Sequence, residues 1–436
     1  MRRKPNRNLS YQIYHWLAVS ITLLLMHQVT LAAPVDFGRL GRPGDTLTLS
    51  AGSTYMFDSN VFRLSPIIDP AAFLGTATRS DQIITTTVTL NLNKTFAMQR
   101  FEVTGSLVDN RYFNFGFLDF LGKNYTAAWN WYVTPYLHGR LSSSHSEALN
   151  NFGNLTGFIN STNRNLRTTD TFRFDGIFEL NRAWHIVGGL SHNIIKNSRL
   201  TVQDFDNKIS SVEGGIRYVF SKGSTLTYKV RAGEGEFIKR PQPIASAMFD
   251  TRFDEMEHEV RLVWPVTAKV AVDPRAGYLE RKHAHFSQRD FNGFVGNFNF
   301  NWAITDKTRL MTGWSHDLSN FQTGANFQLN PAIFQQWSSS YAVTDRFTVA
   351  PAWQITEKTQ LRLRYDYVMR DHHGGVSPLL LEQRRDSQHS AHIALDWQPM
   401  NVLLITGMLQ KDHRSSSLRG FDYDSNAASI SARFTF

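Results

Sequence analysis

Ser315, His316 and Asp317 are the first residues to consider for chemistry, because they supply the three side-chain types of a hydrolytic triad. Neighbours in a strand point to opposite faces, so this contiguous run cannot act as a triad as it stands. Two glycine-containing stretches, residues 233–235 and 374–375, do not open a helix and therefore predict no phosphate-binding loop. Neither pattern indicates an enzyme.

Two histidine pairs are the remaining candidates for chemistry. His283 with His285, and His372 with His373, could begin a metal site, but no third ligand follows either pair at a motif spacing. The chain has no cysteine, which excludes a thiol nucleophile, a disulfide and a Cys-containing metal site. We therefore expect no catalytic residue, no cofactor and no metal, and a hydrolase ranks last among the candidate functions.

Charged side chains show a clearer pattern, because they alternate with apolar ones. In residues 359–371, for example, Leu361 and Leu363 alternate with Arg362 and Arg364. Charges are expensive against lipid but tolerated where water reaches them, so we expect the charged face to line a wet lumen. The candidate lumen-lining residues are Arg100, Glu102, Arg173, Asp175, Glu179, Glu213, Arg217, Lys229, Arg231, Glu257, Glu259, Arg261, Arg362, Arg364, Asp366 and Arg370. Such a wall suits sugar hydroxyls and carboxylates, although solvation alone explains the same residues.

The elements that position these residues are long alternating segments. The expected crossings are residues 46–57, 82–93, 98–112, 122–133, 135–146, 167–180, 183–195, 208–221, 224–238, 252–264, 268–282, 289–304, 308–319, 338–355, 359–371, 386–398, 401–413 and 422–436. We read 338–355 as one long strand, bulged near Asp345, because two crossings do not fit before the turn at 357–358. The prediction is an all-β, antiparallel transmembrane β-barrel of about 18 strands, with about 16 or 20 as alternatives and both termini in the periplasm.

A soluble β-sandwich or a β-solenoid would also show alternation. Strands of soluble proteins run to about 5–6 residues, whereas the segments here are about twice as long, as a tilted membrane crossing requires. Short connections also alternate with longer polar ones, which is typical of periplasmic turns and external loops. The longest external loops are predicted at residues 58–81, 147–166, 239–251, 320–337 and 372–385.

Tryptophan recurs beside the short connections. Four copies stand three residues ahead of a threonine, in residues 131–134, 264–267, 302–305 and 353–356. Because indole prefers the membrane–water interface, we expect an aromatic girdle at the periplasmic end. Its predicted members are Trp131, Trp184, Trp264, Trp302, Trp353 and Trp397. The alternative is that these are core tryptophans of a soluble sandwich.

The N-terminus has the features of a cleaved signal peptide, predicted over residues 1–32. Four basic residues precede a short apolar core, and residues 30–32 form a small-x-small cleavage site. Residues 33–45 would then be a short periplasmic segment and 46–436 the barrel. The formal charge of +9 owes four units to the signal peptide, so basicity predicts no nucleic-acid partner.

The C-terminal strand ends the chain on an aromatic residue. Residues 428–436 alternate strictly between apolar and polar side chains. We predict that this strand pairs with residues 46–57, because closure removes both sheet edges. Phe434 and Phe436 are predicted to act as an assembly signal.

Three stretches resemble a known family. Residues 44–52, continuing to 57–64, resemble the first strand and loop of β-barrel porins from exopolysaccharide operons. Residues 349–366 resemble the EpsL-type exopolysaccharide-biosynthesis family associated with exosortase systems, and residues 433–436 resemble a generic barrel terminus. The resemblance implies an outer-membrane barrel that helps polysaccharide to cross, and it supplies no functional residues.

The expected function is thus a passive outer-membrane channel that assists export of an extracellular polysaccharide. The expected partners are outer-membrane lipid or lipopolysaccharide, the barrel-assembly machinery, the polysaccharide itself and periplasmic export components. A surface anchoring or adhesion barrel, and a general diffusion porin without polysaccharide specificity, are the alternatives.

Overall fold

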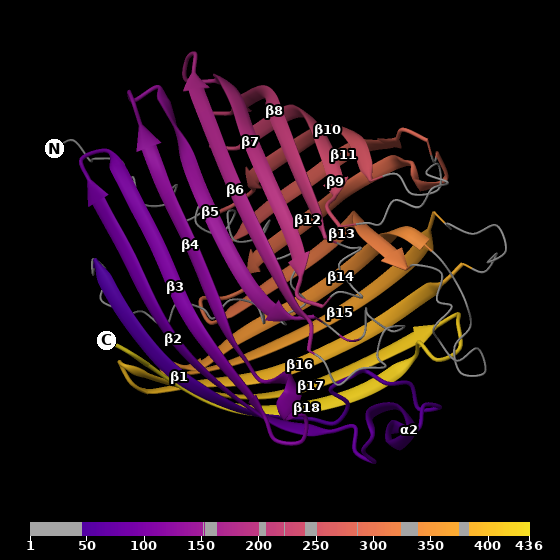
Figure 1. Ribbon diagram of the computed structural model, residues 1–436. Coiled ribbons are helices and arrows are strands. Elements are labelled where there is room, and N and C mark those ends of the chain that lie inside the picture. The colour runs from indigo at the N-terminus through magenta and orange to yellow at the C-terminus, as the bar shows by residue number, and fades with distance from the viewer. Residues whose placement is uncertain are drawn as a thin grey trace.

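Eighteen antiparallel strands form one closed sheet in the computed structural model (Figure 1). The structure describes residues 46–150, 152, 164–199, 206–221, 223–239, 251–285, 287–323, 339–374 and 383–436. The strands are Leu47–Asp58 (β1), Asp81–Phe96 (β2), Gln99–Tyr112 (β3), Phe120–Tyr132 (β4), Leu137–Leu149 (β5), Leu166–Glu179 (β6), Trp184–Asn197 (β7), Asn207–Val219 (β8), Thr225–Phe237 (β9), Arg252–Pro265 (β10), Val270–His283 (β11), Phe291–Ala303 (β12), Thr308–Thr323 (β13), Ser339–Thr356 (β14), Thr359–His373 (β15), Arg385–Met400 (β16), Leu403–Ser416 (β17) and Tyr423–Thr435 (β18). Short helices are Pro70–Leu74 (α2), Gly116–Leu118 (η1) and Ser287–Arg289 (η5). The predicted all-β barrel is confirmed.

The barrel closes where β18 pairs with β1, in antiparallel register from Ser50 with Thr435 to Asp58 with Ala427. Next to these paired residues, the backbone N–H of Phe436 donates to the carbonyl oxygen of Leu49 at 2.8 Å. Every other strand pairs with its neighbours in the chain, so no sheet edge is left open. The predicted pairing of the first and last strands is therefore confirmed.

One detail of the strand prediction is wrong. β14 is a single long strand as predicted, but Asp345 is not bulged, because it pairs in register with His316 and Met369. Trp314 Nε1 and His316 Nδ1 donate to the Asp345 carboxylate at 3.2 and 2.9 Å. These two hydrogen bonds hold the side chain against the regularly paired neighbouring strand. The irregular pairings lie instead near the two ends of β14, between Gln354 and Thr356 against β15 and opposite residues 320–323 of β13.

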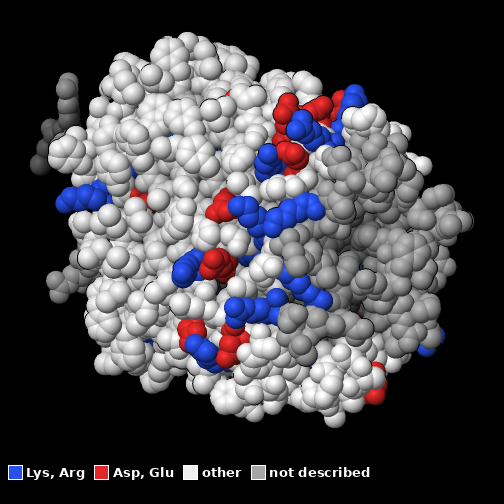
Figure 2. All heavy atoms as spheres, viewed as in Figure 1, with Lys and Arg blue, Asp and Glu red and all other residues white. Residues whose placement is uncertain are grey.

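The two faces of the sheet differ in chemistry. Large apolar side chains are exposed on the outer face of nearly every strand, including Leu90, Phe174, Val260 and Ile393. Figure 2 shows a broad outer face almost free of charge, bordered by a band of Lys, Arg, Asp and Glu side chains. An apolar belt around a closed barrel is the architecture of outer-membrane proteins, so the protein lies in the outer membrane.

The two ends of the barrel also differ. Turns at residues 97–98, 133–136, 180–183, 220–224, 266–269, 304–307, 357–358 and 401–402 lie at one end, together with the start of β1 and the end of β18. Longer connections lie at the other end. Short turns and both barrel termini mark the periplasmic side, as predicted. Within the described ranges, no helix is long and apolar enough to cross a membrane.

Several sequence predictions concern residues that the structure does not describe. The signal peptide at 1–32 and the segment at 33–45 lie outside the described residues, as does most of the predicted loops 147–166, 239–251 and 320–337. Where loops are described, strands extend into them, since β5 continues to Leu149 and β13 to Thr323.

The β1–β2 connection, residues 59–80, is a folded external unit. Its buried side chains pack with those of the β3–β4 and β17–β18 connections in a cluster of Val61, Phe62, Leu64, Ile68, Phe115, Leu118, Leu418 and Phe421. Arg63 adopts a left-handed φ of 54° and its guanidinium lies 2.7 Å from the Asp58 carboxylate. Burial opposes the charge on Arg63, yet Asp58 holds the pKa of Arg63 above its ordinary value. This unit ties the seam strands together outside the membrane.

Candidate functional site: the charged inner wall

All sixteen predicted lumen residues lie on the face opposite the apolar belt. On β10, for instance, Met256 and Val260 are exposed outward, whereas Glu257 and Glu259 between them are covered on the inner face. The same alternation places Arg362 and the other β15 charges inside. The inner wall therefore collects both signs of charge, as a face reached by water can.

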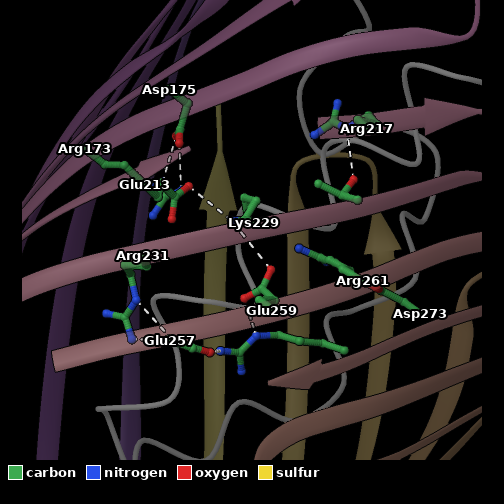
Figure 3. Close-up of polar contacts among 12 residues, drawn as sticks. Arg173, Asp175, Glu213, Arg217, Lys229, Arg231, Glu257, Glu259, Arg261 and Asp273 are labelled. Atoms are coloured by element: carbon green, nitrogen blue, oxygen red, sulfur yellow. Dashed lines mark hydrogen bonds and ion pairs between the residues drawn. The ribbon is translucent and has the colours of Figure 1, made fainter. Parts of the chain in front are cut away.

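Seven of these charges and Arg275 form one chain of ion pairs, here called the ladder. It runs Asp175–Arg173–Glu213–Lys229–Glu259–Arg275–Glu257–Arg231 across β6, β8, β9, β10 and β11. Figure 3 shows Glu213 between Arg173 and Lys229, with Lys229 reaching on toward Glu259. Signs alternate strictly along the ladder, so each charge is flanked by its opposite.

The distances within the ladder are those of charge-assisted hydrogen bonds. Arg173 approaches Asp175 at 2.7 Å and Glu213 at 2.6 Å. Lys229 Nζ lies 3.1 Å from Glu213 and 3.5 Å from Glu259. These contacts fix long side chains on the wall.

The cations of the ladder are more exposed than most of its carboxylates. The exposed fraction is 32% for Arg173 and 21% for Lys229, but only 11% for Glu213 and 3% for Glu257. Three of the four carboxylates, Glu213, Glu257 and Glu259, are thus less exposed than any of the four cations, whereas Asp175 is 31% exposed. The ladder is balanced in formal charge, and its more exposed side chains are mostly cations.

Inward glycines let the ladder lie flat. A Cβ at Gly189 would come within 2.9 Å of both the Asp175 carboxylate and the Phe174 carbonyl oxygen, and one at Gly215 would come within 2.0 Å of the Tyr228 carbonyl oxygen and 2.9 Å of Lys229 Cγ. Larger residues would push these side chains off the wall. Neither glycine carries a charge or a large side chain that would mark it as part of the wall, although both occupy inward positions of alternating segments.

A second group of inner charges lies on β15 and β16, here called the buried pairs. Asp396 is fully buried, accepts from Arg362 Nη2 at 2.8 Å and from Thr406 Oγ1 at 2.7 Å, and Arg362 is 6% exposed. Arg364 contacts Asp366 at 2.6 Å on the neighbouring stretch of β15. These contacts are shielded from water, so they hold the wall together rather than face a solute.

The remaining predicted lumen residues have local partners, each within 3.2 Å. These contacts are Arg100 with Glu102, Glu179 with His138, Arg217 with Thr227, Arg261 with Asp273, and Arg370 with Gln388. None of these contacts extends the ladder, although Figure 3 shows Arg261 and Asp273 close beside it.

Sequence reasoning missed several members of the inner wall. Arg275 is central to the ladder, and Asp273, Arg140, Arg346 and Asp396 each pair with a predicted residue. The alternation of apolar and charged residues is weak in β11, because its outward face carries Pro274 and Ala276 in place of large apolar residues. Charged residues nevertheless occupy the inward positions 273, 275 and 281 of β11, and this spacing could have identified them.

The predicted girdle tryptophans lie on the outer face near the periplasmic turns. Trp184, Trp264, Trp302, Trp353 and Trp397 are exposed there. Trp131 differs, because its ring lies flat over Gly139 and stacks on Phe174, with ring centroids 5.6 Å apart. A Cβ at Gly139 would come within 2.5 Å of the Trp131 ring, so only glycine admits this contact.

The terminal aromatics lie on the same face. Phe434 and Phe436 are both exposed, with nearly parallel rings whose centroids are 6.4 Å apart. They form an apolar patch at the periplasmic end of the seam between β18 and β1. The role in assembly stays a prediction.

The residues first considered for chemistry are separated by the fold. His316 faces outward beside Asp345, whereas Ser315 and Asp317 occupy inward positions. His283 contacts Asp290 at 3.1 Å, and His372 lies 3.6 Å from Asp386. Among the described residues, no group of three or more His, Asp or Glu side chains is arranged to hold a metal.

Comparisons with known proteins find structural likeness only. No protein-family model and no curated protein sequence matches the chain. Among solved structures, the outer membrane protein OpdK from Pseudomonas aeruginosa aligns with a TM-score of 0.47 and 9% identity, over 90% of this chain and 99% of OpdK. The siderophore receptor PirA from Pseudomonas aeruginosa gives 0.44 and 11%, over 91% and 81%. OccAB3 from Acinetobacter baumannii gives 0.45 and 8%, over 89% and 98%. At these values the likenesses carry no functional argument, and the barrel rests on its own strand pairings.

Proposed function

We propose that this protein is a passive outer-membrane channel that favours anionic solutes and serves the export of an acidic extracellular polysaccharide. A barrel of eighteen strands is too wide for its own side chains to fill, which favours an aqueous lumen. The observation that carries the proposal is the ladder, whose cations reach the water while most of its carboxylates are recessed.

Acidic polysaccharide is the proposed cargo because its chemistry matches that wall. Planar guanidinium groups bind carboxylates in two-point hydrogen bonds, and a hydroxyl-rich chain can exchange such contacts along a wet surface. Many weak contacts allow a polymer to slide, whereas one tight site would hold it. The resemblance of residues 349–366 to the EpsL-type family supports the same cargo.

Measuring how strongly polymers block the channel current tests whether the cargo is acidic. The purified barrel in a planar bilayer should conduct, and polygalacturonate should reduce the current more than uncharged dextran of equal length does. Replacing Arg173, Lys229, Arg231 and Arg275 by glutamine should abolish that difference. Equal block by both polymers in the unaltered protein would refute an acidic cargo and leave a general diffusion porin.

The outer-rim cations offer a matched control. Arg111, Arg252 and Lys282 lie beyond the apolar belt, with side chains that are 61%, 79% and 65% exposed. Their replacement by glutamine removes charge without touching the ladder. Preference for polygalacturonate should survive this change.

A surface anchor is the second candidate, favoured by the folded unit at residues 59–80. An anchor would hold polymer at the cell surface through such external structure. Replacing residues 66–78 by a short glycine–serine linker tests this function. Loss of polymer retention with normal secretion would favour the anchor, and unchanged retention would exclude this unit from it.

A further inference from the structure

Uncharged polar side chains form a continuous row across the inner face of β1 to β6. One residue of each strand pairs in register with one residue of the next, in the order Thr48, Asn91, Thr104, Thr126, Ser144 and Thr171. They lie inward because they alternate with exposed outward residues such as Leu90, Tyr125 and Phe172. These residues are here called the hydroxyl row.

The side chains of the hydroxyl row are close enough to form one surface. Directly paired residues of neighbouring strands have Cβ atoms about 4.5–5.5 Å apart. Thr104 Oγ1 donates to Asn91 Oδ1 across the strands at 2.8 Å. Next to this pair, Thr126 is exposed and Ser144 is half-buried. A hydroxyl group carries one donor and two acceptor positions, so this surface can both donate to a solute and accept from it.

No charge lies among the inward residues around the row in the described parts of β1 to β5. Inward positions are uncharged throughout residues 48–56, 83–93, 104–112, 120–132 and 142–148, and most of them are serine, threonine or asparagine. The ladder, in contrast, consists of charged groups only. The inner wall is therefore divided into a charged sector and a neutral, hydrogen-bonding sector.

The hydroxyl row runs from the periplasmic end of the wall to the ladder. Thr48 is the second residue of β1, which begins at the periplasmic end. Thr171 lies in the external half of β6, two residues before Arg173 of the ladder. Ser142, two residues from Ser144, also pairs in register with Arg173. Since inward residues on one strand are two apart, the neutral and charged surfaces adjoin directly.

The two sectors also face each other across the barrel. In the closed sheet of eighteen strands, β9, β10 and β11 stand half the strands away from β18, β1 and β2. Figure 1 shows these two groups of strands on opposite sides of the barrel. A solute between them has the ladder on one side and uncharged wall on the other.

We propose that the hydroxyl row binds the uncharged, hydroxyl-bearing sugar units of the exported polymer, while the ladder binds its acidic units. This inference rests on the proposed export channel and specifies its cargo as a polysaccharide in which neutral sugars accompany acidic ones. Sugar hydroxyls donate and accept hydrogen bonds, as the side chains of the row do. Many weak contacts of this kind let a chain slide from the periplasmic end of the row toward the ladder.

The duration of current blocks by a neutral polymer tests the hydroxyl row. Single channels of the purified barrel are recorded in a planar bilayer with dextran, which carries several hydroxyl groups on each sugar. Polyethylene glycol of equal hydrodynamic size has ether oxygens that accept hydrogen bonds, but no donors along its chain. Dextran blocks should therefore last severalfold longer than polyethylene glycol blocks.

The variant that tests the assignment combines Thr48→Val, Thr126→Val and Ser144→Ala. These changes remove three hydroxyl groups and alter no charge. Thr104 and Thr171, whose hydroxyls bond to asparagine on a neighbouring strand, stay unchanged. Dextran blocks should shorten severalfold, toward the duration of polyethylene glycol blocks, while chloride preference and the stronger block by polygalacturonate persist.

A matched control makes the same kinds of substitution on the outer face. Ser53 and Thr86 pair with each other there, and Thr312 pairs with the exposed Val349. The combination of Ser53→Ala, Thr86→Val and Thr312→Val should leave dextran blocks as long as in the unaltered barrel. Both variants must first show the same heat-modified mobility as the unaltered barrel, so that a folding defect is recognised separately.

Two results would overturn the inference. One is dextran blocks in the unaltered barrel that last no longer than those of polyethylene glycol. The other is dextran blocks that keep their duration when the three inward hydroxyls are removed. Either result would leave the acidic cargo standing if polygalacturonate still blocks more strongly than dextran. Equal block by polygalacturonate and dextran, with blocks that shorten in the inward variant, would instead refute the acidic cargo and support the row as a sugar contact.

Discussion

Two regions of the inner wall use the same residue types for different purposes. The ladder on β6 and β8 to β11 holds its cations where water reaches them, since Arg173 and Lys229 are partly exposed. The buried pairs on β15 and β16 are shielded, and Asp396 has no exposed surface. The two regions have the same residue types and differ in solvent access. The ladder can contact a solute, whereas the buried pairs hold neighbouring strands together.

The physical consequences follow from that difference. Exposed ion pairs contribute about 0–1 kcal/mol each and are screened by salt. Breaking a buried pair leaves an uncompensated charge and costs about 3–5 kcal/mol. Substitutions in the ladder should therefore alter the ion selectivity of the channel with little effect on the free energy of unfolding. Substitutions in the buried pairs should lower the free energy of unfolding with little effect on ion selectivity.

Neither region forms unless the barrel closes, so the largest effect is expected at the seam. Deleting Phe436, or replacing Phe434 and Phe436 by aspartate, should prevent most of the protein from reaching the outer membrane as a folded barrel. The terminal strand would lose its exposed aromatic patch beside β1. Membrane fractionation with heat-modified mobility measures the outcome. Normal insertion of either variant would show that these aromatics are not an assembly signal.

The next largest effect is expected at the buried pairs. Asp396→Ala leaves Arg362 buried without its carboxylate and should lower the free energy of unfolding by about 3–5 kcal/mol. Urea unfolding in vesicles measures it. The double variant Arg362→Leu with Asp396→Leu removes both charges and should recover most of the loss. A single variant as stable as the unaltered protein would contradict the distinction between the two regions.

The smallest effect on stability is expected in the ladder. Lys229→Gln removes the cation between Glu213 and Glu259 and should change the free energy of unfolding by less than about 1 kcal/mol. The same variant should shift ion selectivity toward cations, because two carboxylates lose their counter-charge. A loss of stability as large as that of Asp396→Ala would place the ladder among the structural contacts.

Much of the fold could be predicted because a period of two is the direct consequence of strand geometry. The strands and the inward placement of residues such as Arg231 follow from alternation alone. Solvent access does not follow from it, and for this reason Arg362 and Arg231 looked equivalent in the sequence. Alternation also failed to identify Arg275, whose strand has a weakly apolar outer face, and it could not show that Trp131 is covered by Phe174 across Gly139.

In the proposed channel, the ladder presents positive charge to solutes in the lumen. The most direct test is the reversal potential of the purified barrel in a planar bilayer that separates two concentrations of potassium chloride. We predict a potential of the sign that chloride preference produces, reduced when Arg173, Lys229, Arg231 and Arg275 are replaced by glutamine. A potential of the opposite sign in the unaltered protein, showing potassium preference, would contradict the account.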